Sequence, residues 1–392
     1  MAPSTETLLQ RLLGGIEREL PRAIDLRRRL HAHPELSHAE HWTAAAVAAE
    51  LPVACATVAG SGRLARVGPQ SGRVVAVRAE LDGLPVRERT GAPFSAEGEV
   101  MHACGHDVHM AALVALARAT HDLGEELPAG LLVVLQPSEE AYPSGAEELA
   151  RGVLASDPPA AIVAAHVHPE LQWGTVALDA GTVNASCDQF EITVAGEPSH
   201  AAYPHRGRDP ILAISEIVVA LHAQLGRRVD PLAGASLTVG VLQGGSAENV
   251  IPSSARARGD LRAHRHQDRL ALRRMVSEVA TGVAAAHGAR ASVEIVAGEP
   301  ALQNDAAIVQ RARALLGAAQ LSAAGEWRSC GSDDFAFFGE LAPLAMAFVG
   351  LAGAPGFDPH PLHHPELLPP DAAVRVLARV QAILYLAAAG YD

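Results

Sequence analysis

The sequence contains no lysine, so all 31 of its basic residues are arginines. Enzymes that form a Schiff base with a carbonyl substrate use a lysine amine for it, and this chemistry is therefore excluded. The arginines face 44 acidic residues, which gives a formal net charge of -13. Nucleic-acid binding needs a basic surface to neutralise phosphates. We therefore expect no nucleic-acid partner and a small-molecule substrate.

Cysteines, aromatic residues and long apolar runs are scarce as well. The four cysteines lie far apart and are too few for a disulfide scaffold. Aromatic residues make up 4% of the chain and apolar residues 49%, which predicts cores of small aliphatic side chains. No stretch approaches the ~18 consecutive apolar residues of a membrane span, and residues 1–15 lack the features of a secretory signal. We expect a cytoplasmic protein without a membrane partner.

The length of 392 residues favours two domains. Apolar positions recur at roughly helical spacing from residue 6 to 33, and Pro21 predicts that they form two helices. A further helix is predicted over residues 106–121. Short apolar runs predict buried strands at 73–80, 131–136 and 160–165. Strands that alternate with helices predict a mixed, mostly parallel sheet in an α/β domain.

Residues 188–297 have an order of their own, which begins with a strand in which Phe190, Ile192 and Val194 alternate with polar residues. The predicted order is strand, helix, strand, strand, helix, strand, which can close into a ferredoxin-like α+β sandwich. We predict three segments: a first part of the catalytic domain at 1–183, an inserted lid at 184–298 and a second catalytic part at 299–392.

The segment MHACGHDVHM places Cys104, His106, Asp107 and His109 at the start of a predicted helix. A thiolate and imidazoles at this spacing could hold one side of a metal site. The competing interpretation is a helix capped by Asp107 with incidental histidines.

Two adjacent carboxylates, Glu139 and Glu140, follow the predicted strand at 131–136. Side by side they would repel each other, so one could bind metal while the other carries protons. Solvated loop acids are the alternative.

Histidines form two more clusters. His166 and His168 follow a predicted strand, and His360, His363 and His364 lie in a proline-rich loop. Taken singly, a histidine beside proline in a loop is usually just exposed.

The positions of these residues relative to the predicted strands strengthen the metal interpretation. Glu80 and Asp82, like three of the clusters, lie just after predicted strands, and the carboxyl ends of strands in an open α/β sheet form a ligand crevice. The candidates outnumber the three or four ligands that one zinc ion needs, which favours two divalent metal ions.

A co-linear series of motifs spans nearly the whole chain, and with it the sequence resembles the metallo-aminoacylase and carboxypeptidase G superfamily. The nearest branch contains hippurate hydrolases, N-acetyl-amino-acid deacetylases and auxin-conjugate hydrolases. The motifs are RRRLHAHPELSHAE, RAELDGLPVRERTGAPF, MHACGHDVHM, LQPSEEAYPSGAEELARGVL, PSHAAYPHRGRDPI, GGSAENVIPSSARARGDLR and SDDFAFF.

The resemblance implies roles for nine residues. The implied metal ligands are Cys104, His106, Glu140, His166 and His363. The resemblance makes Glu139 the general base, and His200, Asn249 and Arg262 would contact the substrate from the inserted domain.

Some positions depart from the family pattern. Glu80 stands where aspartate is usual, His168 where an aromatic residue is commoner, and Glu366 where phenylalanine is frequent. These changes predict a more polar substrate pocket. The neighbouring His364 leaves the choice between it and His363 as ligand to the alignment.

The implied reaction is hydrolysis of an N-acyl amino acid, with Glu139 taking a proton from a metal-activated water. His200 and Asn249 would stabilise the oxyanion, and Arg262 would pair with the substrate carboxylate. Zinc or manganese is expected, with cobalt or nickel as further candidates. A dipeptidase or aryl-glutamate hydrolase is the alternative enzyme, and a non-catalytic metal-binding relative is the other class. The lid is expected to form a homodimer.

Overall fold

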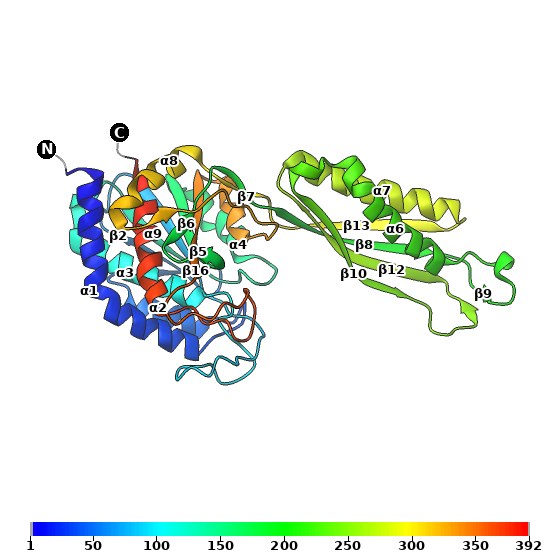
Figure 1. Ribbon diagram of the computed structural model, residues 1–392, viewed down its shortest axis with the longest axis horizontal. Helices are drawn as coiled ribbons and strands as arrows, with labels where there is room; N and C mark the ends of the chain where they lie inside the picture. Colours follow the sequence, from blue (N-terminus) through cyan, green and yellow to red (C-terminus); the bar gives the residue numbers. More distant parts are fainter. Residues whose placement is uncertain (1–2, 391–392) are drawn as a thin grey trace. The chain divides into compact units, whose positions relative to one another are not determined.

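The computed structural model describes residues 3–390, which form two compact units (Figure 1). The first unit comprises the described residues up to Gly181, then Gln303–Trp327, then the described chain from Phe337 onward. The second comprises Thr182–Leu302 and Arg328–Ala336. Each unit has its own hydrophobic core.

The first unit carries helices on a large sheet. Its helices are α1 (Thr5–Ala32), α2 (His41–Glu50), α3 (His106–Leu123), α4 (Gly145–Arg151), α5 (Val153–Ser156), α8 (Ala306–Leu315) and α9 (Ala372–Ala389). Its strands are β1 (Ala56–Val58), β2 (Gly62–Val67), β3 (Val74–Glu80), β4 (Gly130–Gln136), β5 (Ala161–Gln172), β6 (Thr175–Ala177), β15 (Ser322–Ala323) and β16 (Leu344–Ala352).

The eight strands follow the order β1-β2-β4-β3-β5-β16-β6-β15. The four central strands, β4, β3, β5 and β16, are parallel, whereas β1, β2 and β6 add antiparallel pairs. The predicted mixed, mostly parallel sheet is thus confirmed. Strand β5 is longer than predicted, because its pairing with β16 continues through and beyond His166. Since Arg78 pairs with Ala164, His166 lies at the level where β3 ends.

The prediction of two helices before residue 33 was wrong, because α1 is continuous through Pro21. Proline in a helix interior removes a hydrogen bond and costs about 3 kcal/mol. Pro21 is exposed, however, while Leu12 and Ile16 before it and Leu26 and Leu30 after it are fully buried. Burial of each such side chain contributes roughly 1.5–3 kcal/mol, which outweighs the local cost.

Helices α1, α3 and α9 pack against one another, and α9 also packs on β5 and β3. Among the described residues, α9 is the one helix long and apolar enough to cross a membrane. Because 83% of its apolar window is buried within the structure, α9 serves here as a core helix.

The second unit has the element order strand, helix, strand, strand, helix, strand predicted for residues 188–297. These elements are β8 (Ser186–Ala195), α6 (Pro210–Arg228), β10 (Ala235–Gly244), β12 (Ser254–Ala263), α7 (His266–Ala286) and β13 (Arg290–Ala297). The strands form an antiparallel sheet in the order β10-β12-β8-β13. Two short strands, β9 (Ser199–His200) and β11 (Val250–Ile251), form a separate pair. The chain passes between the units within β7 (Gly181–Asn184) and β14 (Leu302–Asn304), and again at each end of Arg328–Ala336.

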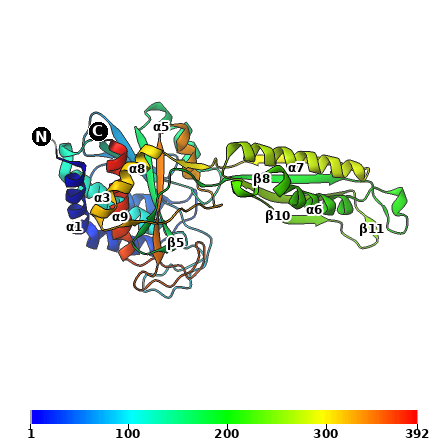
Figure 2. The same ribbon diagram turned by 45° about the horizontal axis from the view of Figure 1, so that its top comes forward.

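Helices α6 and α7 pack against each other and on the four-stranded sheet, along which α7 runs (Figure 2). Phe190, Ile192 and Val194 are buried beneath them, as their alternation predicts. Asp188 ties α7 to β8, because its carboxylate accepts hydrogen bonds at 2.5–2.9 Å from the guanidinium groups of Arg269 and Arg273.

Candidate metal centre

The site begins at Gly105, where the chain turns into α3. Gly105 has a φ of 87°, in the left-handed region that favours glycine. A Cβ at this position would lie 2.6 Å from Cγ2 of Val167 on β5, so the close approach requires glycine. Cys104 and His106, the residues on either side of this turn, both have buried side chains.

His106 presents one ring nitrogen to the interior of the site. Its Nδ1 donates a hydrogen bond to the backbone oxygen of Asp82 at 2.9 Å, which leaves Nε2 of the neutral ring with a lone pair. Nε2 lies 3.9 Å from carboxylate oxygens of both Glu139 and Glu140. Nε2 therefore faces the two adjacent carboxylates, where it can hold either a proton or a metal ion.

His166 and Cys104 face each other. Nδ1 of His166 and the backbone oxygen of Val167 are 2.6 Å apart, which makes Nδ1 the donor, while Nε2 lies 3.4 Å from Sγ of Cys104. Burial lowers the pKa of His166 well below its usual value, and the neighbouring His109 adds to this effect. His166 is therefore neutral at pH 7, which is the form in which imidazole binds metals.

Glu139 and Glu140 lie in the loop after β4, and buried groups hold this loop on both sides. Oε1 of Glu40 accepts a hydrogen bond from the N–H of Ser138 at 2.8 Å. The N–H of Glu140 donates to Oδ2 of Asp82 at 2.9 Å. Glu139 lies between these two anchored residues.

Of the two neighbouring histidines, His363 is the one directed at the site. It has a φ of 67°, and its N–H donates to the backbone oxygen of Ala103 at 2.8 Å. Its Nε2 lies 3.5 Å from Oε1 of Glu140. His364 instead stacks on His360, with ring centroids 4.5 Å apart.

The donor groups of this site fit a cation. Within residues 3–390, three of its buried atoms have no hydrogen-bond partner: Nε2 of His106, Oδ1 of Asp82 and Oε1 of Glu140. Burial by itself lowers the pKa of His106, but the carboxylates of Glu80 and Asp82 outweigh it and raise this pKa to about 10. Burial also raises the pKa of Glu140. The site therefore favours a positive charge, which a proton on His106 or a bound metal can supply.

His109 supports the site from outside. One donor atom each from Glu80, His106, His109 and His166 lies within 4.8 Å of the others. However, Nδ1 of His109 donates to Oε2 of Glu80 at 2.8 Å, and Nε2 accepts the N–H of Val167 at 3.1 Å. With both nitrogens in hydrogen bonds, the ring orients its neighbours and has no lone pair left for a metal.

Glu40 is a residue of the site that the sequence did not reveal. It is fully buried, and besides the Ser138 N–H it accepts hydrogen bonds from the N–H of His38 at 3.0 Å and from Oγ of Ser61 at 2.8 Å. An acidic residue just before a helix is normally a helix cap or a solvated side chain. A glutamate at this position therefore does not by itself indicate a role in the site. Its place in the motif LHAHPELSHAE was the one available hint.

The second unit contains the remaining predicted residues and brings two of them together. The residue after His200 donates its N–H to the backbone oxygen of Asn249 at 2.9 Å. Both side chains are exposed, and β9 lies beyond one end of the four-stranded sheet (Figure 1). Arg262 lies near the opposite end of that sheet, where Nη1 donates to the backbone oxygen of Cys330 at 3.0 Å.

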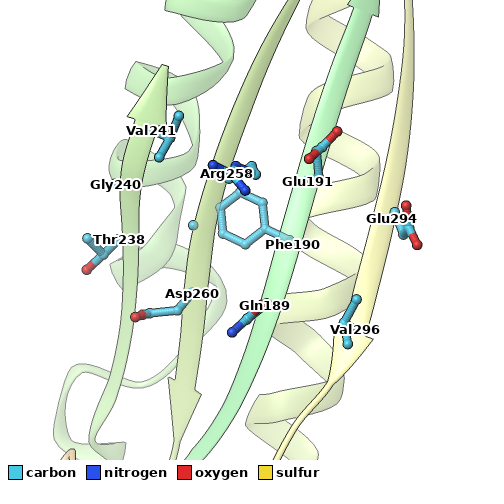
Figure 3. A pocket seen from close by; sticks show the side chains of 11 residues that line it. Gln189, Phe190, Glu191, Thr238, Gly240, Val241, Arg258, Asp260, Glu294 and Val296 are labelled. Carbon is cyan, nitrogen blue, oxygen red and sulfur yellow. The ribbon is translucent and has the colours of Figure 1, made fainter. Parts of the chain in front are cut away.

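A cavity of about 440 Å³ lies on the four-stranded sheet of the second unit. Figure 3 shows Arg258 beside Glu191 on adjacent strands, with Asp260 and Glu294 nearby. The residues that line it include none of the predicted ligands. This cavity is therefore distinct from the metal centre in the first unit.

Comparisons with known proteins identify relatives of this chain. The sequence profile of peptidase family M20/M25/M40 matches residues 76–386. An N-acetyl-L-cysteine deacetylase of Bacillus subtilis is 34% identical over 372 residues, covering 92% of this chain and 86% of that protein. An N-acetyldiaminopimelate deacetylase of Bacillus pumilus is 32% identical over 377 residues, covering 94% and 98%.

A solved structure agrees with the sequence comparisons. It is the crystal structure of a dinuclear metal-binding peptidase of the M20 family from Bacillus subtilis. The TM-score is 0.82 at 30% sequence identity, and the match covers 94% of this chain and 98% of that one.

Proposed function

Since the chain belongs to peptidase family M20/M25/M40, we propose that it hydrolyses N-acetylated amino acids in particular. The chain is a metal-dependent amidohydrolase that acts on N-acyl amino acids. The observation that carries metal-assisted hydrolysis is the buried Nε2 of His106, which has no hydrogen-bond partner among the described residues and lies 3.9 Å from carboxylate oxygens of Glu139 and Glu140. The acetyl group is supported by the deacetylase relatives, which cover nearly the whole chain.

Five residues would hold two divalent cations in this enzyme. They are Cys104, His106, Glu140, His166 and His363. The thiolate favours zinc, and manganese, cobalt and nickel are the other candidates. When bound, such a pair lowers the pKa of a water molecule and polarises the amide carbonyl.

Glu139 would act as the general base. Its carboxylate takes a proton from water as the water oxygen bonds to the amide carbon. The same carboxyl returns this proton to the amide nitrogen as the carbon–nitrogen bond breaks. The products are a carboxylic acid and an amine, so water is the one co-reactant.

The second unit would serve as a ferredoxin-like lid, as its strand order supports. His200 of the partner subunit, with Asn249 beside it, would donate a hydrogen bond to the oxyanion that forms during attack. Arg262, whose guanidinium is partly exposed, would pair with the substrate carboxylate.

The lid would also form a homodimer contact. Strands β10 and β13 are the edges of its sheet. Edge strands present unpaired backbone groups that natural proteins cover or pair. Pairing of one such edge with a second copy would satisfy these groups.

A substrate screen tests the proposed activity. The metal-free protein is reconstituted with zinc or manganese and assayed on N-acetyl amino acids, longer N-acyl amino acids, dipeptides with free amines and aryl-glutamates. We expect the highest kcat/KM for the acetyl series. Greater activity on dipeptides or aryl-glutamates would replace the proposed specificity, and inactivity on every amide would contradict catalysis.

The general base is tested by Glu139→Gln, with the exposed Glu170→Gln as a control. We expect Glu139→Gln to lower kcat by about 10²-fold or more while metal analysis still finds both ions. The control should retain both activity and metal. Loss of metal in Glu139→Gln would mean that the roles of Glu139 and Glu140 are exchanged.

A further inference from the structure

A second group of metal-binding side chains lies in the segment that carries His363. His360, His364 and Glu366 offer donor atoms that all lie within 4.8 Å of one another. None of these three belongs to the ligand set assigned above. We propose that they form, with Asp358, an additional site for a zinc-like divalent cation.

The spacing around His360 suits a shared cation. Nε2 of His360 lies 3.3 Å from Oδ2 of Asp358 and 3.5 Å from Oε2 of Glu366. Two donors that bind one tetrahedral zinc at about 2.0–2.2 Å are themselves about 3.3–3.6 Å apart. The same distances also suit a protonated His360 between two carboxylates, so distance by itself leaves two interpretations.

The second histidine favours the cation. One ring nitrogen of His364 lies within 4.8 Å of the donor atoms of His360 and Glu366, and the two rings, which stack in parallel, need only turn for both nitrogens to face one cation. A protonated imidazole needs acceptors alone, and the two carboxylates already supply them, whereas a transition metal gains a further donor from His364. Nδ1 of His364 accepts the N–H of Glu366 at 3.2 Å. This pair is only partly buried, so water can take over the N–H when the ring binds a metal, unlike at the buried His109.

The donor chemistry selects the class of metal. Two imidazoles and two carboxylates suit zinc and its transition-metal neighbours, whereas magnesium and calcium prefer oxygen donors throughout. The two carboxylate charges balance one dication. Nε of Arg89 lies 3.8 Å from the other oxygen of Glu366, Oε1, and therefore leaves Oε2 to the site.

The position of the group gives the cation a structural consequence. Asp358 and His360 precede His363 in the chain, and His364 and Glu366 follow it. A cation held by both sides would order this loop around His363. This consequence rests on the proposed role of His363, whereas binding of the additional ion does not.

Zinc binding by the full-length protein tests the proposal. Equilibrium dialysis against buffered free zinc compares the wild type with His360→Gln and Glu366→Gln, and His121→Gln changes an exposed histidine on α3 as the matched control. Circular dichroism verifies that each variant is folded. We expect the wild type and the control to bind one zinc ion more than the two site variants. The dissociation constant of this additional ion should rise at least about tenfold in each site variant.

Two outcomes would overturn the site. Either the wild type binds no more zinc than His360→Gln, or millimolar magnesium displaces the additional ion as readily as zinc does. Amide hydrolysis is measured on the same samples. An additional zinc ion without hydrolysis would refute the proposed function and leave this site intact. Hydrolysis without an additional zinc ion would refute this site and leave the proposed function intact.

Discussion

At the scale of single residues, hydrogen bonds decide which imidazole nitrogens remain available to a metal. His106 and His166 each donate through Nδ1 and direct Nε2 into the site. His109 lies within the same group of donors but uses both nitrogens for Glu80 and Val167. Histidines of similar burial therefore have different roles.

This difference predicts opposite results for two substitutions. Cys104→Ala should lower bound metal and turnover together, because it removes a donor that faces His166. His109→Gln should retain the metals but lower the free energy of unfolding by about 1–3 kcal/mol, since buried partners lose hydrogen bonds. Metal analysis and urea unfolding measure both effects, with Cys55→Ala as the thiol control. Full metal content with unchanged turnover in Cys104→Ala would remove Cys104 from the ligand set.

Glu40 is predicted to act by positioning the loop that carries Glu139. Glu40→Gln keeps the shape of the side chain but turns one acceptor into a donor that faces other donors. We expect kcat to fall while KM and metal content change little, and Glu40→Asp to recover part of the loss. An equal rise in KM, or loss of metal, would indicate general disruption of the site instead.

At the scale of elements, α7 is attached to β8 through a charge cluster. Asp188 has no exposed side-chain surface and accepts hydrogen bonds from Arg269 and Arg273. Burial by itself raises the pKa of Asp188, but the two arginines outweigh it and lower this pKa to about 2. A lowered carboxyl pKa stabilises the folded state at pH values above the pKa of the unfolded state, and this stabilisation is lost as the pH falls through the folded-state pKa.

Because the pKa of Asp188 is lowered in the folded state, the stabilisation it provides should depend on pH. Asp188→Asn should lower the free energy of unfolding by about 1–2 kcal/mol at pH 7. The difference from the wild type should shrink as the pH falls from about 4 to about 2, because Asp188 is protonated near pH 4 in the unfolded state and near pH 2 in the folded state. Urea unfolding followed by circular dichroism measures it, with the exposed Glu248→Gln as a control in the same unit. A difference that stays constant over this pH range would contradict the electrostatic explanation.

At the scale of the whole molecule, the proposed dimer raises the question of which subunit supplies His200. His200 belongs to the second unit, whereas the candidate metal ligands and Glu139 belong to the first. We predict that His200 serves the active site of the partner subunit. The chemistry of one site would then depend on two chains.

Complementation between two inactive variants tests this prediction. Glu139→Gln and His200→Ala are co-expressed with different tags, and mixed dimers are isolated. If His200 acts in trans, each mixed dimer has one site with both residues intact, so about half of the wild-type activity should return. Verified mixed dimers that remain inactive would assign His200 to its own subunit or to lid structure.

The sequence by itself determined the parts of this protein that depend on local pattern. Alternating and helical periodicities predicted β3, β4, α3 and the element order of the second unit, because these patterns reflect burial within one element. Motif positions likewise identified Cys104, His106 and the adjacent carboxylates as candidates for one site.

The tertiary structure decided what depends on contacts between distant residues. Burial on both sides of Pro21 kept α1 continuous although the local cost favoured a break. Partners from other elements set the hydrogen-bonding state of His109 and gave Glu40 its role. The backbone contact with Ala103 distinguishes His363 from His364, and long-range packing joins 328–336 to the second unit. Such contacts leave no local pattern, because their energy arises only when segments far apart in the chain meet.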